Sequence, residues 1–252
     1  MRASLLASLL LTSACTTIVV RPGPRRGPES EKHDVDGAIV LNGERTRVTW
    51  SDGDSFDFKS GRYEGQGTRL VGFNTLEAYG PVHRWGGWTR EELYEIAKSG
   101  SALAASQEWE CTTQGEPDAY GRLLVDCPKL AREMALAGVG LAYAVRGRPP
   151  RLVLDAMHQA QKARRGMWAK GVPDTILTAL HSRDEDKEGK YPTAANRVLD
   201  TQTGETVLRK HLDNYALCEE VCDGDSCMVY VPYELRYHDQ PPCLVGHSPS
   251  EN

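Results

Sequence analysis

No stretch of the 252-residue sequence reaches the about 18 to 20 consecutive apolar residues that a transmembrane helix needs. The sequence also has no internal repeat. Apart from these two absences the composition is ordinary for a globular protein, with 40% hydrophobic and 26% charged residues. A chain of this length holds one good-sized domain and a smaller appended region.

The formal net charge of −5 is unevenly distributed along the chain. Residues 45–170 contain 18 basic and 15 acidic residues, a net charge of +3, whereas residues 171–252 contain 7 and 15, a net charge of −8. The charge of the whole chain argues against a polyanionic partner, but the charge of residues 45–170 does not.

The first 15 residues have the pattern of an export signal. Arg2 precedes the apolar "SLLASLLL", and the small residues of "TSAC" end at Cys15. We expect residues 1–15 to be a signal peptide with Cys15 acylated as in bacterial lipoproteins, although Thr12 replaces the usual leucine. An ordinary signal peptide cleaved nearby is the alternative. Either way, the protein is expected to be exported, held in the bacterial cell envelope by a lipid on Cys15 or secreted.

Residues 16–42 are rich in proline, glycine and charge and are expected to form a flexible linker. Without Cys15, six cysteines remain, an even number in a compartment that permits disulfides. We predict a Cys111–Cys127 bridge and two bridges among Cys218, Cys222, Cys227 and Cys243, for which three pairings are open. A zinc site formed by Cys218, Cys222 and Cys227 with His211 and His238 is the less favoured alternative.

The pattern between residues 43 and 171 alternates strands with helices. Strands are predicted at 46–50, 55–61, 67–73, 108–112 and 121–127, and helices at 89–106, 129–144 and 152–168. Thr89 and Glu92 have capping-box spacing at the start of the first helix. This order predicts an α+β domain, a small closed β-barrel with three packed helices. Residues 172–252 are expected to be a charged linker and a small disulfide-stapled extension.

A polar cluster stands at the end of the third predicted strand, in "RLVGFNTLE". Arg69, Asn74, Thr75 and Glu77 follow one another closely there, and the strand end can bring them near Asp54 of "SDGD". Guanidinium groups neutralise a phosphate, oxygen ligands suit a hard cation, and a carboxylate can activate water. The cluster is therefore a candidate phosphate site.

Four motifs in order, "VTWSDGDSF", "RLVGFNTLE", "DAYGRLLV" and "AQKARRGMW", resemble those of the staphylococcal nuclease (thermonuclease) family. The resemblance covers about residues 45–170. It implies a five-stranded OB-type barrel with three helices and Ca²⁺-dependent hydrolysis of phosphodiester bonds in DNA and RNA.

The same resemblance implies a role for each matching residue. Asp54, Asn74 and Thr75 would bind Ca²⁺, and Arg69 and Arg122 would grip the phosphate. Glu77 would position or deprotonate the attacking water, and Tyr120 and Tyr143 would line the nucleotide pocket. The sequence departs from the family pattern at two positions: Asn74 replaces an aspartate, which removes a negative charge from the metal site, and Leu76 replaces a proline.

Three questions stay open at this level. The domain is expected to be an active nuclease, or alternatively a catalytically weakened OB-fold module that binds nucleic acid or a protein ligand. His83, Arg84, Trp85 and Trp88 either form a rim for stacking bases or pack a loop, the second being slightly favoured. The charge of the C-terminal extension argues against nucleic-acid contact and is compatible with a protein partner, a lid or stabilisation.

Overall fold

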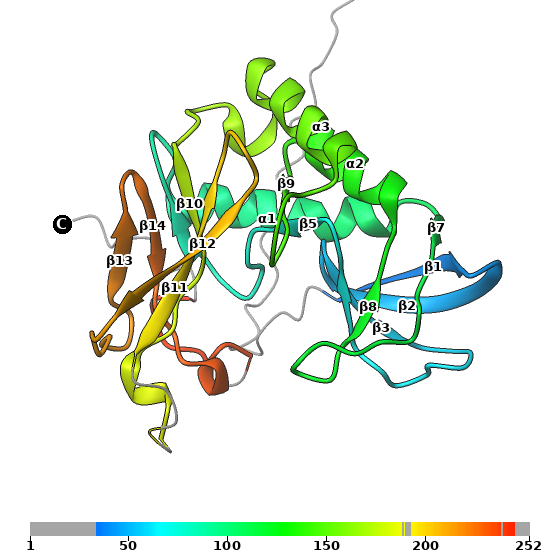
Figure 1. The fold of residues 1–252 in the computed structure, drawn as a ribbon, viewed down its shortest axis with the longest axis horizontal. Helices are drawn as coiled ribbons and strands as arrows, with labels where there is room; N and C mark the ends of the chain where they lie inside the picture. The colour runs from blue at the N-terminus through cyan, green and yellow to red at the C-terminus, as the bar shows by residue number, and fades with distance from the viewer. Residues whose placement is uncertain (1–33, 188, 190–192, 238, 245–252) are drawn as a thin grey trace, which may run out of the picture. The chain divides into compact units, whose positions relative to one another are not determined.

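The computed structural model describes residues 34–187, 189, 193–237 and 239–244. The predicted signal peptide, Cys15 and residues 16–33 of the predicted linker lie outside these residues. The described chain is a mixed α+β structure with three α-helices, which are α1 (Arg90–Ala105), α2 (Pro128–Ala137) and α3 (Arg151–Lys162) (Figure 1). No helix in the described ranges is both long enough and apolar enough to cross a membrane.

The strands of the first half of the chain and those of the second half form separate sheets, except that β6 of the first half pairs with β14 of the second. The first half contributes β1 (Val35–Leu41), β2 (Glu44–Asp52), β3 (Ser55–Phe58), β4 (Thr68–Leu70), β5 (Phe73–Thr75), β6 (His83–Arg84), β7 (Trp109–Cys111), β8 (Leu123–Val125) and β9 (Gly140–Ala142). The second half contributes β10 (Thr175–Ala179), β11 (Ala194–Asp200), β12 (Thr206–His211), β13 (Glu220–Asp223) and β14 (Ser226–Val229).

Five sheets are present, and none of them closes into a barrel in the described part of the chain. Their strand orders are β3-β2-β1-β7, β4-β8, β5-β9, β10-β11-β12 and β13-β14-β6. The predicted α+β class and three helices are thus confirmed, whereas the closed barrel is not observed as one continuous sheet. Isolated bridges Asp57↔Gly67 and Thr112↔Asp126 connect the ends of neighbouring sheets. Short strands and turns interrupt the ladders at these points.

Several element boundaries differ from those predicted. β1 lies inside the predicted linker 16–42, because Ala38, Ile39 and Leu41 are buried while Val35–Leu41 pairs with β2. The predicted helix 129–144 ends at Gly138, whose φ of 74° is left-handed and favours glycine. The chain then forms β9. Helix α1 begins as predicted, with the reciprocal capping-box hydrogen bonds of Thr89 and Glu92.

The larger hydrophobic core lies between the β1–β3 hairpins and the helices. Trp50, Phe56 and Phe58 are each at most 1% exposed, and their rings pack edge to face at centroid distances of 4.8 and 5.1 Å. Trp85 is fully buried, His83 is 3% exposed, and the Trp88 Nε1 donates to the Met167 carbonyl at 2.8 Å. The segment 83–88 therefore packs a loop, as the favoured alternative predicted.

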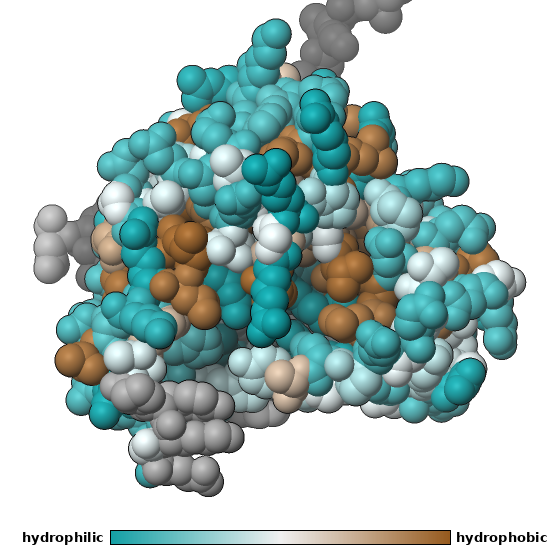
Figure 2. Space-filling view, viewed as in Figure 1, coloured by the Kyte–Doolittle hydropathy of each residue, from teal (hydrophilic) through white to brown (hydrophobic). Residues whose placement is uncertain are grey.

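A second, smaller core connects the C-terminal region to the segment that follows β5. Tyr79 and Val82 pack there with residues of β10, β11 and β14. The two-stranded pairing of β6 with β14 runs beside this core, with Cys227 opposite Arg84 and Met228 opposite His83. On the face drawn in Figure 2, hydrophobic residues gather over these C-terminal strands within a largely hydrophilic surface.

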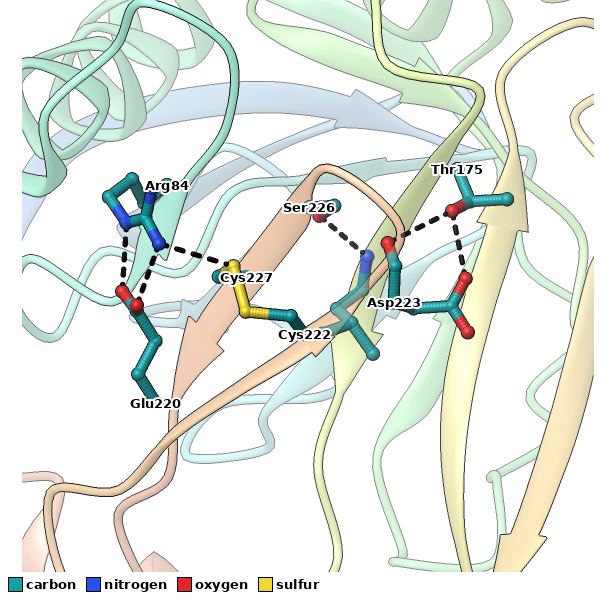
Figure 3. The surroundings of a disulfide bond; sticks show 8 residues. Arg84, Thr175, Glu220, Cys222, Asp223, Ser226 and Cys227 are labelled. Atoms are coloured by element: carbon teal, nitrogen blue, oxygen red, sulfur yellow. Dashed lines mark hydrogen bonds and ion pairs between the residues drawn. A yellow bond between two sulfur atoms is a disulfide. The ribbon is translucent and has the colours of Figure 1, made fainter.

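The hairpin β13–β14 is held on both sides by side-chain contacts (Figure 3). On one side Arg84 donates from Nε and Nη2 to the two carboxylate oxygens of Glu220, at 3.0 and 2.7 Å. On the other side the Thr175 hydroxyl donates to the Asp223 carboxylate at 2.9 Å. Because β6 of the first half pairs with β14 of the C-terminal region in one sheet, the C-terminal region has a fixed position beside the first half.

All six cysteines of the described chain form disulfides. Cys111–Cys127 is bridged as predicted, and the open pairings resolve as Cys218–Cys243 and Cys222–Cys227. Glu220, Cys222 and Cys227 place potential metal-binding atoms close together. Their two sulfur atoms are bonded to each other, however, so they are not thiolate ligands, and the zinc alternative loses its ligands.

Candidate active site

The predicted site residues converge on Asp54, which is 1% exposed in the turn between β2 and β3. Arg69 on β4 forms an ion pair with it, Nη1 to Oδ1 at 2.6 Å. The backbone N–H of Thr75 on β5 donates to the other carboxylate oxygen, Oδ2, at 2.9 Å. The β2–β3 turn and the strands β4 and β5 thus meet at one carboxylate.

Glycine at position 53 permits this meeting. A Cβ on Gly53 would lie 2.6 Å from Cγ2 of Thr75 and 3.2 Å from the carbonyl carbon of Gly100 in α1. No larger residue fits without displacing a strand or the helix. The glycine of the "DGD" motif therefore lets the turn carry Asp54 up against β5.

Asn74, the residue that departs from the family pattern, is 6% exposed and bonded on both sides of its amide. Its Oδ1 accepts a hydrogen bond from Nη2 of Arg69, and its Nδ2 donates to the carbonyl oxygen of Thr75 at 2.8 Å. Asn74 thereby fixes both the guanidinium and the backbone carbonyl. An aspartate could not donate the second of these bonds.

Asp54, Arg69 and Thr75 border a cavity of about 400 Å³, whereas Asn74 lies outside the set of residues that lines it. Its walls are formed by the residues Ser51, Asp52, Asp54, Ser55, Phe56, Asp57, Gly67, Thr68, Arg69, Thr75, Leu76, Glu77, Arg122, Tyr233, Arg236 and Tyr237. Five of the predicted site residues are therefore brought together from motifs that are separated in the sequence: Asp54, Arg69, Thr75, Glu77 and Arg122.

Glu77 lies half-buried in the cavity wall, two residues beyond β5. Its backbone N–H donates to Nε2 of His83 at 3.2 Å, which holds the loop that carries it even though Leu76 replaces proline. Burial raises the pKa of the Glu77 carboxyl above its ordinary value, and the guanidinium of Arg236 is the strongest opposing influence. A carboxylate with a raised pKa is a better proton acceptor.

Arg122 is presented by the turn that Asp118 organises. The Asp118 carboxylate accepts from the backbone N–H of Tyr120 and of Arg122, both at 2.9 Å, and from the Arg122 side chain, Nη2 at 2.7 Å. The Arg122 side chain is 41% exposed, so its guanidinium faces the open part of the cavity. Asp118, the first residue of the motif "DAYGRLLV", therefore positions Arg122, a role that the sequence alone did not indicate.

The two predicted nucleotide-pocket tyrosines lie beside the arginines, outside the set of residues that lines the cavity. Tyr143 is 5% exposed, with its ring centroid 6.0 Å from Cζ of Arg69. Tyr120 is 79% exposed, with its ring centroid 5.5 Å from Cζ of Arg122. In this arrangement Tyr143 supports Arg69 from inside the fold, and Tyr120 remains available at the surface.

The lining residues that no sequence motif pointed to include Asp52, Tyr233, Arg236 and Tyr237. Asp52 is the first aspartate of the "DGD" motif, and its Oδ1 accepts from the Asp54 N–H at 3.1 Å. Burial and the neighbouring Asp54 carboxylate raise the pKa of Asp52 well above its usual range. The other three belong to the C-terminal extension, where no sequence pattern pointed to this cavity.

The oxygen-rich wall fits a hard divalent cation. Asp52, Asp54 and Thr75 of the lining offer oxygen atoms only, the ligand type that Ca²⁺ prefers. Asn74 lies behind this wall, and its amide oxygen accepts a hydrogen bond from Arg69. Burial, and after it the Asp54 carboxylate, raises the pKa of Asp52. A cation bound beside the two carboxylates would favour their ionised forms.

An Asn74→Asp substitution is expected to strengthen Ca²⁺ binding by about tenfold, because an additional anionic ligand raises the affinity of an oxygen site. Titration calorimetry of wild type and variant with Ca²⁺ measures the difference. Asn74→Ala serves as the control, since it removes the amide without adding charge. Equal affinities of wild type and N74D would show that position 74 is outside the cation site.

No protein-family model matches the chain, and no curated protein sequence matches it.

Proposed function

We propose that this protein is a Ca²⁺-dependent hydrolase of phosphodiester bonds in DNA or RNA, built on the plan of the staphylococcal nuclease family. One observation carries the proposal. Asp54, Arg69, Thr75, Glu77 and Arg122, matched to that family from separate motifs, border the same cavity. Two guanidinium groups, a half-buried carboxylate and a set of oxygen ligands suit hydrolysis of a phosphate diester.

The OB-type barrel belongs to this proposal. The bridges Asp57↔Gly67 and Thr112↔Asp126 lie between β3 and β4 and between β7 and β8. With the ladders of the two sheets, they outline a ring in the order β1, β2, β3, β4, β8 and β7. This ring supports a barrel and has one strand more than the five that the resemblance implies.

In the proposed mechanism, Glu77 accepts the proton of the water whose oxygen bonds to phosphorus. The bond from phosphorus to the leaving ester oxygen breaks, and that oxygen takes a proton from solvent. Arg69 binds a non-bridging phosphate oxygen from a position fixed by Asp54 and Asn74, and Arg122 binds from the open side, where Asp118 orients it. Both guanidinium groups keep their charge as negative charge grows on the phosphate oxygens. Asp52, Asp54, Asn74 and Thr75 would hold Ca²⁺, which when bound would polarise a phosphate oxygen.

Export is part of the same proposal. Outside cells Ca²⁺ is present at millimolar concentration, which suits a cation site with Asn74 in place of an aspartate. Asn74 also favours the alternative function, binding of nucleic acid without cleavage, because it gives the cation site one anionic ligand fewer than an aspartate would.

The test is digestion of single-stranded DNA by the purified mature protein with its disulfides formed, across a Ca²⁺ titration and with a chelator. Arg122→Ala is expected to lower cleavage by about 10²-fold, as loss of one charge-stabilising donor does. Arg148→Ala is the matched control, because Arg148 is an exposed arginine paired with Glu205 away from the cavity.

The control variant is expected to keep wild-type activity. Failure of the wild-type protein to cleave at any Ca²⁺ concentration, while folded, would refute the enzymatic proposal. Binding of the DNA in that case would support the alternative function.

A further inference from the structure

The cavity has one wall that comes from the C-terminal extension. Tyr233, Arg236 and Tyr237 lie in and just after a short 3₁₀ segment, Tyr233–Leu235 (orange-red in Figure 1), and all three line the cavity with Arg69 and Glu77. Tyr233 is 71% exposed and Tyr237 is 44% exposed. Their ring centroids are 6.0 Å apart.

The wall is anchored to the loop that carries Glu77. The Gln240 side chain donates from Nε2 to the backbone carbonyl of Tyr79 at 2.7 Å and also to that of Arg236. The Tyr79 ring lies 5.2 Å from Cζ of Arg236 and 5.9 Å from the ring centroid of Tyr237. Arg236 further donates from Nε to the Val231 carbonyl at 3.0 Å. These contacts fix the wall close to the candidate base.

The exposure of the two tyrosines distinguishes a binding surface from packing. Tyr230, which precedes them in the same region, is 3% exposed and donates its hydroxyl to Glu185 at 2.8 Å, as a structural tyrosine does. Tyr233 and Tyr237 instead present ring surface to the cavity. Aromatic rings beside a guanidinium group are the combination on which unpaired bases stack while the phosphate backbone is bound.

We infer that Tyr233, Arg236 and Tyr237 form a subsite for a nucleotide next to the scissile phosphate of a single-stranded nucleic acid. One tyrosine ring stacks on its base, the other ring, inclined to the first by 71°, supports it edge to face, and Arg236 binds its phosphate. This inference rests on the proposed function and adds to it a substrate preference, because a base within a duplex is already stacked on its neighbours and has no free face to offer.

The experiment compares two short oligonucleotides of equal length, one of single-stranded DNA and one with abasic sugars throughout. Fluorescence anisotropy measures the binding of each in chelator, so that no cleavage interferes. The double substitution Tyr233→Ala and Tyr237→Ala is expected to weaken binding of the base-containing oligonucleotide by about tenfold, the size of one stacking contact. Binding of the abasic oligonucleotide is expected to stay within twofold of wild type.

Three controls make the result specific. The corresponding double phenylalanine variant keeps the rings and is expected to restore wild-type binding. Tyr94→Ala changes a tyrosine of α1 that does not line the cavity and is expected to leave both affinities unchanged. Arg236→Ala is expected to weaken both oligonucleotides equally, because it removes a phosphate contact that is independent of the base.

The inference is overturned if the double alanine variant binds both oligonucleotides as wild type does, or loses affinity for both to the same extent. It is separable from the proposed function. If the wild-type protein binds the base-containing oligonucleotide more tightly than the abasic one but never cleaves, the proposed subsite stands and the proposed nuclease activity is wrong. If the wild-type protein cleaves DNA but the variants at Tyr233, Arg236 and Tyr237 bind both oligonucleotides as wild type does, the proposed function stands and the proposed subsite is wrong.

Discussion

An Arg69→Ala variant is expected to lose cleavage by about 10³-fold and to be less stable by about 3 kcal/mol in the absence of Ca²⁺. The Asp54 side chain is 2% exposed, and its direct ion-pair partner is Arg69, at 2.6 Å. Removing the arginine leaves a buried carboxylate without its counter-charge, which is the costly way to break such a pair. Urea unfolding in chelator measures the stability, and digestion of single-stranded DNA measures the activity.

The same variant is expected to bind Ca²⁺ more tightly than wild type. Arg69 occupies Oδ1 of Asp54 and the amide oxygen of Asn74, and it brings positive charge beside the proposed cation ligands. The substitution leaves these two oxygens free to bind Ca²⁺ and removes the positive charge that repels the cation. Tighter Ca²⁺ binding together with lost cleavage would separate the two roles, whereas parallel loss of both would show that the fold of the site had collapsed.

Arg69→Lys provides the matched comparison. Lysine keeps the charge that Asp54 requires but cannot bind Asp54, Asn74 and a phosphate oxygen with one planar group. We expect most of the stability to return and the activity to remain low. Full recovery of activity in the lysine variant would contradict the assigned role of the guanidinium group.

The second large effect concerns acid stability and the His83 side chain. His83 is 3% exposed, and burial lowers its pKa from 6.5 to about 4. Its Nε2 accepts the Glu77 N–H, so the neutral ring is the form that the fold uses. In the unfolded chain the ring takes up a proton near pH 6.5, whereas the folded chain resists it until about pH 4.

The free energy of unfolding therefore contains a contribution that is complete above pH 6.5 and is lost as the pH falls through 6.5 towards 4. The difference between the two pKa values corresponds to about 3 kcal/mol. His83→Gln, which can still accept the Glu77 N–H but does not titrate, isolates it from the acidic groups of the cavity. Urea unfolding at pH 7 and pH 4 is expected to show a smaller loss of stability for the variant. Equal losses would assign the acid sensitivity to other groups.

The candidate site was predictable from the sequence wherever one motif carried both the chemistry and the local structure. Arg69 lies on β4, Asn74 and Thr75 lie on β5, and Glu77 follows two residues later, so one short stretch of sequence supplies them all. Gly53 lets the Asp54 turn approach β5. The fold class, three helices and the Cys111–Cys127 bridge were predictable for a similar reason, because periodicity and spacing are local properties.

The C-terminal wall was not predictable, because it depends on tertiary contacts that no local pattern encodes. The net charge of −8 in residues 171–252 argued against contact with nucleic acid. Charge summed over a segment does not report where one side chain lies, and Arg236 and the two tyrosines are brought to the cavity by β14 pairing with β6 and by Gln240. The pairing of the last four cysteines was undetermined for the same reason.

The Cys218–Cys243 disulfide encloses the whole segment that carries Tyr233, Arg236 and Tyr237. When the contacts around this closed loop open, the disulfide limits the conformational entropy that the segment can gain, and it thereby stabilises the closed form. With the thiols reduced, that segment would be held by its hydrogen bonds and packing alone. Reduction would therefore make this wall less stable, and affinity for single-stranded nucleic acid is expected to be higher in an oxidising compartment than in a reducing one.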